Sequence, residues 1–207
     1  MIPRLYAIVD AGLLAARGVA LKDFSAGLRA AGVTLAQYRD KSGSPQEVLR
    51  GARALRAIMQ NSDCRLILND RADLAVLAKF DGVHVGQDDL SPEDARRVVG
   101  ASRVVGVSTH TEEQVRKAEL SVADYVAFGP IFATGTKLDA EQVVGLDGLR
   151  CARALTTKPL VAIGGITRAN ARSVIEAGAD SVAVISGLLG QGESTEKVAR
   201  DFLELLA

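Results

Sequence analysis

The stretch LILNDRADLAVLAKFDGVHVGQDDL, Leu66 to Leu90, holds two short apolar runs with a helix-like segment between them. Each run breaks off into polar, acidic residues: Asp70 closes the first run, and Asp89 follows the second. A buried strand, a helix and a second buried strand in succession indicate two parallel strands joined by a right-handed crossover. The stretch therefore predicts two strands whose carboxyl ends carry aspartates.

The same unit recurs along the whole chain. Runs rich in Val, Ile and Leu predict strands at 5–10, 34–40, 65–70, 82–86, 103–109, 125–131, 159–165 and 181–187. Strands and helices that alternate at this length fit an α/β fold, a (β/α)₈ TIM barrel of eight parallel strands forming one domain over residues 1–207. A doubly wound open sheet would need a Gly-rich turn after the first strand, and IVDAGLLAARG (8–18) has no G-x-G-x-x-G motif.

Composition excludes several kinds of partner. The chain has 25 basic and 25 acidic residues, so it lacks the excess positive charge that binds nucleic acids and anionic membranes. Tryptophan is absent, and no apolar run is long enough to cross a bilayer. The N-terminal MIPRLYAIVDAG lacks the zones of a signal peptide, and Cys64 and Cys151 lack metal-type spacing. We therefore expect a cytoplasmic protein with reduced thiols.

Several short motifs mark the ends of helices. Three segments predict capped N-termini: SPQE at 44–47, SPED at 91–94 and TEEQ at 111–114. Gly32, Gly82 and Gly178 fall where helices end and strands begin, as expected of helix-terminating glycines. These motifs are structural, and they leave the residues after each strand as candidates for function.

In a barrel of this kind the chemistry lies on the rim formed by the carboxyl ends of the strands. Asp70 and Asp89 follow neighbouring strands, so their carboxylates can face one point, where a cation would relieve their repulsion. Oxygen ligands suit Mg²⁺, which takes the rest of its shell from water and substrate phosphates. Two structural alternatives stay open: Asp70 could cap a helix beginning at Arg71, and Asp89 could lie in a solvated turn before Ser91.

The segment QYRDK places Gln37, Arg39 and Lys41 at alternate positions, so the three side chains point to one side. A guanidinium and an ammonium group beside a metal held by carboxylates would form a diphosphate site. The alternative is a surface ion-pair cluster with Asp40.

The far side of the rim carries glycines and hydroxyls. AIGGI (162–166) and VISG (184–187) end the last two strands, where backbone N–H groups bind a phosphate in many barrels. The loop FGPIFATGTKLDA holds Thr134, Thr136 and Lys137 and is interpreted as a mobile lid, with a plain flexible loop as the alternative. His84 is expected to be a packed structural residue, and a catalytic role for His110 stays open.

Together these motifs resemble the thiamine-phosphate synthase family over almost the whole chain. The matching motifs are Gln37, Arg39 and Lys41 (Q-x-R-x-K); Asn69, Asp70 and Arg71 (N-D-R); Gly82 to Asp89 (G-V-H-x-G-Q-x-D); Gly106 to His110 (G-V-S-x-H); Gly129 to Lys137 (G-P-I-F-x-T-x-T-K); Ile163 to Ile166 (I-G-G-I); and Ile185 with Ser186. Each motif is weak alone, and their common order is specific.

The resemblance implies a reaction and a set of roles. A pyrimidine diphosphate, 4-amino-2-methyl-5-hydroxymethylpyrimidine diphosphate, would join with a thiazole phosphate or its carboxylate form to give thiamine phosphate and diphosphate. The implied contacts are Gln37, Arg39, Lys41, Asn69 and Lys137 for the diphosphate; Ser108 for the aminopyrimidine; Thr134, Thr136, Gly165, Ile185 and Ser186 for the thiazole phosphate; and Asp70 and Asp89 for Mg²⁺. Arg39, Lys41, Ser108 and Lys137 are the candidate catalytic residues.

Three other functions stay open at this point. A thiazole tautomerase shares the barrel and the phosphate site but should lack the full metal and diphosphate set. A sugar-phosphate epimerase would leave the paired acids without a task, and a non-catalytic barrel that binds a thiamine precursor would leave the charged residues unexplained. The expected partners are the two small-molecule substrates, with assembly into a homo-oligomer left open.

Overall fold

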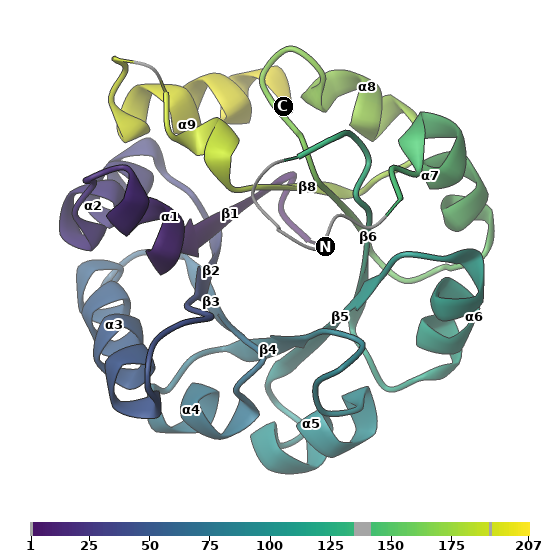
Figure 1. Cartoon of the computed structure of the whole chain (residues 1–207), viewed down its shortest axis with the longest axis horizontal. Coiled ribbons are helices and arrows are strands. Elements are labelled where there is room, and N and C mark those ends of the chain that lie inside the picture. The colour runs from purple at the N-terminus through teal and green to yellow at the C-terminus, as the bar shows by residue number, and fades with distance from the viewer. Residues whose placement is uncertain (1, 135–141, 191) are drawn as a thin grey trace.

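Eight parallel strands pair in chain order, and the eighth pairs back with the first to close a barrel, as the sequence predicts (Figure 1). The computed structural model describes residues 2–134, 142–190 and 192–207. The strands are β1 (Leu5–Asp10), β2 (Leu35–Arg39), β3 (Arg65–Asn69), β4 (Gly82–Val85), β5 (Val104–Thr109), β6 (Tyr125–Phe128), β7 (Leu160–Ile163) and β8 (Ser181–Val184). The predicted fold class is confirmed.

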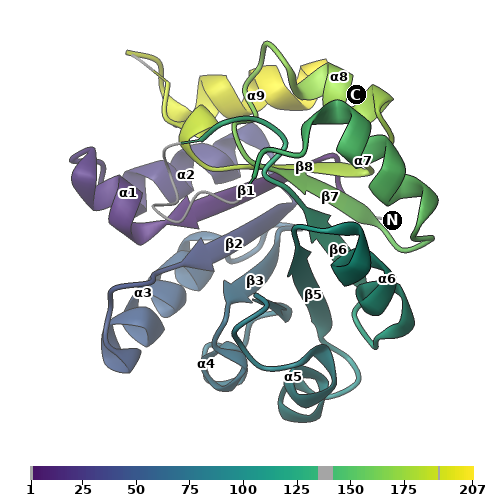
Figure 2. The same ribbon diagram turned by 45° about the vertical axis from the view of Figure 1, so that its right-hand side comes forward.

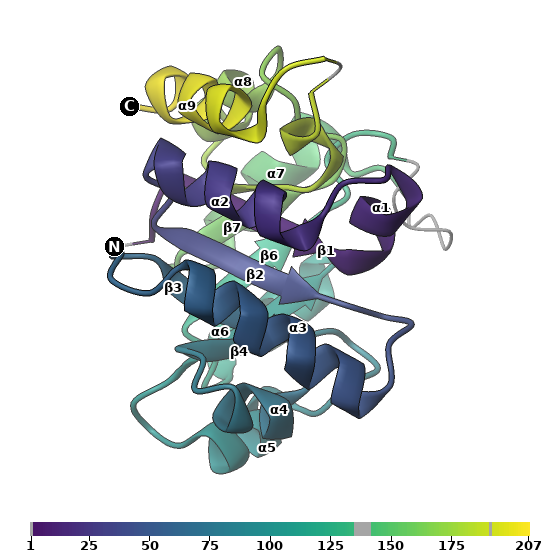
Figure 3. The same ribbon diagram turned by 90° about the vertical axis from the view of Figure 1, so that its left-hand side faces the viewer.

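Helices form an outer ring around these strands. They are α1 (Ala11–Ala16), α2 (Leu21–Ala31), α3 (Pro45–Ile58), α4 (Ala72–Leu77), α5 (Pro92–Val99), α6 (Glu112–Leu120), α7 (Gly145–Ala154), α8 (Ala171–Glu176) and α9 (Thr195–Leu205), with a 3₁₀ turn η1 (Ser186–Leu188). Figure 2 shows α6 and α7 outside β5 to β7, and Figure 3 shows α2 between α9 and α3. No helix in the described ranges is long and apolar enough to cross a membrane.

The alternation of one strand with one helix is broken at the two ends of the chain. Two helices, α1 and α2, follow β1, and η1 precedes α9 after β8. Several strands also end earlier than predicted: β6 stops at Phe128 and β8 at Val184. The apolar residues beyond these points belong to the loops of the rim, so the hydrophobic pattern alone overestimated the strands.

The core has two layers, one on each side of the sheet. Leu5, Ala7 and Val9 of β1 face the helices, within a large cluster that fills the space between barrel and ring. Tyr6 and Ile8 of the same strand face the barrel interior, where they pack in a second, smaller cluster. Alternate residues of a strand point to opposite faces, so both faces of β1 are buried. Polar side chains inside the barrel therefore need partners within it.

Helix ends confirm most of the sequence motifs and correct one. Ser44 with Glu47 and Thr111 with Gln114 form capping boxes, while Ser91 accepts from the backbone of Asp94 without the reciprocal half. Gly32 and Gly178 have positive φ, as predicted.

The prediction for Gly82 is wrong: this glycine is the first residue of β4, and Lys79, with φ of 55°, takes the left-handed position after α4. A side chain at Gly82 would collide with the carbonyl oxygen of Val104 on β5. Close pairing of two strands, rather than a helix end, is therefore the reason for glycine here.

Candidate active site

Charged side chains gather where the first four strands end. Lys41 Nζ lies 2.5 Å from Asp70 Oδ2, and Arg39 forms an ion pair with Asp10. The side chains of Arg39 and Asp10 are mostly buried, at 17% and 7% exposure, whereas Lys41 is 53% exposed. Two positive and two negative groups thus face one another across the ends of β1, β2 and β3, with the ammonium group open to solvent.

Asp70 stands at a turn that aims its carboxylate at this cluster. Its φ is 62°, and its backbone N–H donates to His84 O at 2.7 Å, so the end of β3 is tied to β4. Helix α4 begins at Ala72 with no side-chain cap at its start. The alternative that Asp70 caps this helix is therefore wrong, and its carboxylate is left for the rim.

The carboxylate of Asp89 reaches the same point from β4. Asp89 Oδ2 accepts from the backbone N–H of Gly86 at 2.7 Å, which holds the exposed turn in place. Burial raises the pKa of Asp70, the Lys41 ammonium group opposes that rise, and the neighbouring Asp89 carboxylate adds to it. The carboxylates of Asp70 and Asp89 therefore converge, as the sequence predicts. The turn that carries Asp89 is also exposed to solvent, as the structural alternative for Asp89 proposed.

The donor set at this point suits a hard divalent cation. It consists of two carboxylates from neighbouring strands, and the described residues contain no group of three or more His, Cys, Asp or Glu side chains that could hold a metal. Mg²⁺ needs few protein ligands, because it keeps waters and accepts substrate phosphate oxygens. Asp70 and Asp89 fit such an ion.

Asp10 is a site residue that sequence reasoning missed. Its Oδ1 accepts from the backbone N–H of Leu13 at 2.8 Å and caps α1, while its Oδ2 accepts from Arg39. The signal was present in the sequence, since an aspartate at a strand end directly before a helix predicts an N-cap. The alternative that Arg39 and Lys41 pair with Asp40 is wrong: the Asp40 carboxylate accepts from the backbone of Ser42 and Gly43, at 3.2 and 2.8 Å.

Three predicted contact residues line the barrel interior below the charged cluster. Gln37 is buried and donates to the Tyr6 hydroxyl at 2.8 Å, and Asn69 is half-buried at the end of β3. Ser108 Oγ lies 2.8 Å from His84 Nε2, and the carbonyl of Ser108 accepts from Gln87 at 2.5 Å. The structural role predicted for His84 is confirmed by its burial and its hydrogen bonds.

A cavity of about 170 Å³ opens at the other half of the rim, over the ends of β5 to β8. Five of its lining residues are predicted substrate contacts: Ser108, Thr134, Gly165, Ile185 and Ser186. Gly164 and Gly165 have φ of 103° and 64°, and a Cβ on Gly165 would lie 2.6 Å from the carbonyl oxygen of Ala133. Glycine is required because two loops approach closely at this wall.

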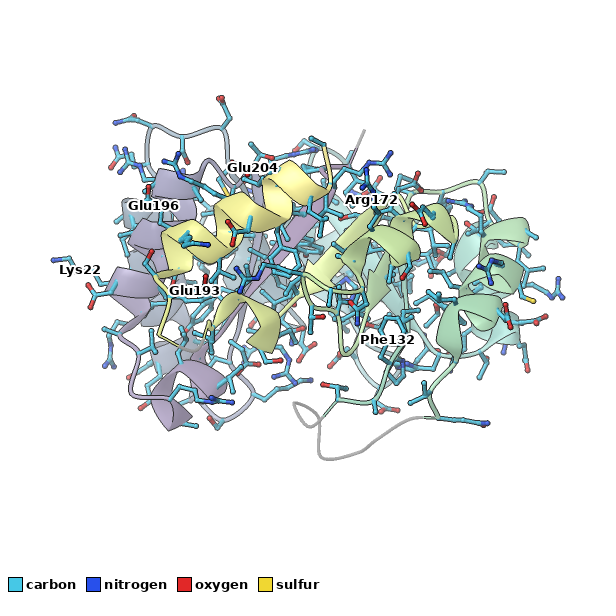
Figure 4. The ribbon with its side chains drawn as sticks, turned by 90° about the horizontal axis from the view of Figure 1, so that it is seen from above. Lys22, Phe132, Arg172, Glu193, Glu196 and Glu204 are labelled. Carbon is cyan, nitrogen blue, oxygen red and sulfur yellow. The ribbon has the colours of Figure 1, made fainter. Side chains whose placement is uncertain are left out.

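Two side chains hold loops on this half of the rim. His110 Nδ1 lies 2.7 Å from the carbonyl oxygen of Gly129, so one ring nitrogen of this histidine holds the loop after β6. Arg168, on the loop after β7, pairs with Glu193 and with Asp201 of α9. Figure 4 shows Glu193 at the start of α9. Thr136 and Lys137 lie outside the described residues.

Comparison with known proteins identifies the relatives of this chain. Residues 5–188 match the family described as "Thiamine monophosphate synthase". The thiamine-phosphate synthase of Koribacter versatilis is 56% identical over 207 residues, 99% of this chain and 96% of that protein. The protein of the same name from Chloroflexus aurantiacus is 43% identical, covering 93% of this chain and 88% of that protein.

A solved structure agrees with the sequence relatives. The thiamine phosphate pyrophosphorylase of Pyrococcus furiosus superposes with a TM-score of 0.86 at 30% identity, covering 98% of this chain and 95% of that one. Both the sequence match and this superposition extend over the strands whose ends carry the charged cluster and the cavity. The chain belongs to the thiamine monophosphate synthase family.

Proposed function

We propose that the protein is a transferase of thiamine biosynthesis. It joins 4-amino-2-methyl-5-hydroxymethylpyrimidine diphosphate with a thiazole phosphate, or its carboxylate form, and releases thiamine phosphate and diphosphate. One observation carries the proposal: the rim is divided into a charged half, at the ends of β1 to β4, and a cavity walled by glycines, at the ends of β5 to β8. A reaction between a diphosphate and a monophosphate needs two such anion sites.

The free cysteines, Cys64 and Cys151, favour a location in the cytoplasm, where thiols stay reduced.

The charged half would bind the diphosphate. Arg39 presents a planar fork held by the Asp10 carboxylate, and the exposed Lys41 offers a point charge that can turn toward an incoming anion. Gln37, Asn69 and Lys137 complete this subsite in the proposal. When diphosphate leaves the pyrimidine, negative charge accumulates on its oxygens, so positive groups already oriented there stabilise the transition state.

Asp70 and Asp89 would hold Mg²⁺ beside these cations. When bound, the ion would supply positive charge to the departing diphosphate. Lys41 pairs with Asp70, and its positive charge offsets part of the repulsion between the two carboxylates. The exposed Lys41 ammonium group would contact the diphosphate when Asp70 and Asp89 hold the ion.

The other half would hold the thiazole phosphate. Thr134, Gly165, Ile185 and Ser186 line this cavity and offer hydroxyls and backbone N–H groups of the kind that bind phosphate without charged side chains. Thr136, which lies outside the described residues, would add a second threonine hydroxyl in the proposal. Loss of diphosphate from a benzylic-type carbon leaves a cation stabilised by the aminopyrimidine. The protein must then orient the thiazole nitrogen toward that carbon, and no general base is needed at the bond that forms. Ser108 lines the side of the cavity that faces β4 and would contact the aminopyrimidine.

A direct assay tests this function. Purified protein is mixed with both substrates and Mg²⁺, and thiamine phosphate is followed after oxidation to its fluorescent form. Product should require both substrates and the metal. Asp89→Asn should abolish metal-dependent turnover, whereas Asp88→Asn, a matched change at the adjacent exposed aspartate, should leave it unchanged. Absence of product under all conditions would reject the proposal and favour a tautomerase or a binding protein.

A further inference from the structure

Five polar side chains form one unbroken hydrogen-bonded chain across the interior of the barrel. Gln37 Nε2 donates to Tyr6 Oη at 2.8 Å, and Tyr6 Oη lies 3.0 Å from Tyr125 Oη. Tyr125 Oη lies 2.8 Å from His84 Nδ1, and His84 Nε2 lies 2.8 Å from Ser108 Oγ. The chain joins β2, β1, β6, β4 and β5, and both of its ends are predicted substrate contacts.

One direction of donation along these hydrogen bonds gives both buried tyrosine protons an acceptor. The Tyr6 hydroxyl accepts from Gln37, and either tyrosine could donate in the Tyr6–Tyr125 hydrogen bond; donation by Tyr6 is the arrangement that gives its buried proton an acceptor in this network. In that arrangement Tyr125 donates to His84 Nδ1, and the His84 tautomer that accepts there carries its proton on Nε2. His84 Nε2–H therefore donates to Ser108 Oγ, and the Ser108 hydroxyl proton points away from the chain.

Packing fixes the rings that carry this chain. The His84 and Tyr125 rings are stacked, with centroids 5.5 Å apart, and the Tyr6 and Tyr125 rings meet edge to face at 6.0 Å. Gly106 makes room for the Tyr125 ring, because a Cβ at this position would overlap it. Burial raises the pKa values of Tyr6 and Tyr125, so both hydroxyls keep their protons at neutral pH.

We propose that Tyr6, Tyr125 and His84 are positioning residues that fix the Ser108 hydroxyl as a hydrogen-bond donor to an acceptor nitrogen of the bound aminopyrimidine ring. This inference rests on the proposed function, in which Ser108 contacts that ring. A hydroxyl free to rotate could accept from an N–H group equally well. A hydrogen bond from His84 occupies one lone pair of Ser108 Oγ and leaves the hydroxyl proton to be donated, so the site favours a heterocycle that presents an unprotonated nitrogen.

The direction of hydrogen-bond donation from Gln37 to Ser108 is testable without any substrate. The protein has only two histidines, so nitrogen-15 labelling of histidine gives two ring systems, and the set lost in His84→Asn belongs to His84. At neutral pH the wild-type spectrum should show Nε2 protonated and Nδ1 unprotonated. Tyr125→Phe should shift both resonances toward a mixture of tautomers, and Tyr38→Phe, a tyrosine packed on the outer layer, should leave them in place. A protonated Nδ1 in the wild type would overturn the assignment.

The effect on substrate is tested by a double-mutant cycle. Tyr125→Phe should lower kcat/KM for the pyrimidine diphosphate about tenfold, as expected for the loss of one oriented hydrogen bond. The KM for the thiazole phosphate should not change. In a Ser108→Ala background the same change should have an effect of less than about twofold, because the residue acts through Ser108. Tyr38→Phe should have no effect in either background.

These outcomes separate the inference from the proposed function. A tenfold loss that persists in the Ser108→Ala background would show that Tyr125 has a general structural role, and the inference would be wrong. A wild-type protein that forms no thiamine phosphate and does not bind the pyrimidine diphosphate would reject the proposed function, and with it the role of Ser108 toward the ring. The direction of the chain would still be decided by the histidine spectrum.

Discussion

The pair formed by Asp10 and Arg39 gives the sharpest prediction for stability, because the aspartate has two separable tasks. It accepts from the backbone of Leu13 at the start of α1, and it carries the charge that pairs with Arg39. Asp10→Asn keeps an amide oxygen that can cap the helix and removes the charge, whereas Asp10→Ala removes both. The two variants therefore measure the two tasks in turn.

The magnitudes follow from the burial of the pair. A hydrogen bond to a charged group contributes about 1.5–3 kcal/mol, and the pair is shielded well enough, at 7% and 17% side-chain exposure, for this range to apply. Loss of an N-cap costs about 1 kcal/mol. We expect Asp10→Asn to lower the free energy of unfolding by about 2 kcal/mol and Asp10→Ala by about 3 kcal/mol.

Urea unfolding followed by far-ultraviolet circular dichroism measures these losses, and the absence of tryptophan makes this signal preferable to fluorescence. The matched control is Asp10→Asn in an Arg39→Met background, where the charge has no partner and the change should be close to neutral. An Asp10→Asn change that costs as much in that background as in the wild type would contradict the role of the charge pair. Equal losses of stability in the Asn and Ala variants would contradict the separate capping role.

Three further outcomes are expected. Asp89→Ala should abolish metal-dependent turnover and leave thiazole-phosphate affinity nearly intact in equilibrium binding, because the two subsites lie on different halves of the rim; equal loss of both would contradict this arrangement. A thiol reagent should modify the exposed Cys151 of the native protein rapidly and spare Cys64, whose pKa is raised to about 12 by burial. Rapid modification of both cysteines in the folded protein would contradict this prediction. In alkaline titration, phenolate absorbance should stay low until the protein unfolds, because burial raises the pKa of Tyr38 to about 12 and those of Tyr6 and Tyr125 further. The raised pKa values stabilise the folded state at pH values below the ordinary tyrosine pKa, and this contribution is lost as the pH rises above it. Ionisation of the tyrosines near pH 10 in the folded protein would contradict the prediction.

Much of the fold was predictable because its signals are local. Runs of apolar residues marked all eight strands, and capping motifs marked the starts of α3 and α6, since both kinds of signal depend on residues close in sequence. The failure at Gly82 has a non-local cause. Its lack of a side chain is required by Val104 on the next strand, which no reading of the segment around Lys79 could reveal.

The candidate site was predictable in position and less so in its internal connections. Parallel strands bring their ends to one rim, so the meeting of Asp70 and Asp89 followed from topology alone. The partner of Arg39 did not follow, because it depends on the register between β1 and β2, in which Asp10 stands opposite Arg39. The chain from Gln37 to Ser108 depends likewise on which side chains meet across the interior, where five strands contribute one residue each.

The location of the cation is the claim on which the proposed chemistry depends most. Crystals grown with diphosphate and Mn²⁺ in place of Mg²⁺ allow that position to be read from anomalous scattering. We predict a single strong peak between the carboxylates of Asp70 and Asp89, in contact with the diphosphate, with Lys41 moved from Asp70 onto the anion. A peak on any other part of the rim, or diphosphate bound with no metal beside these aspartates, would contradict it.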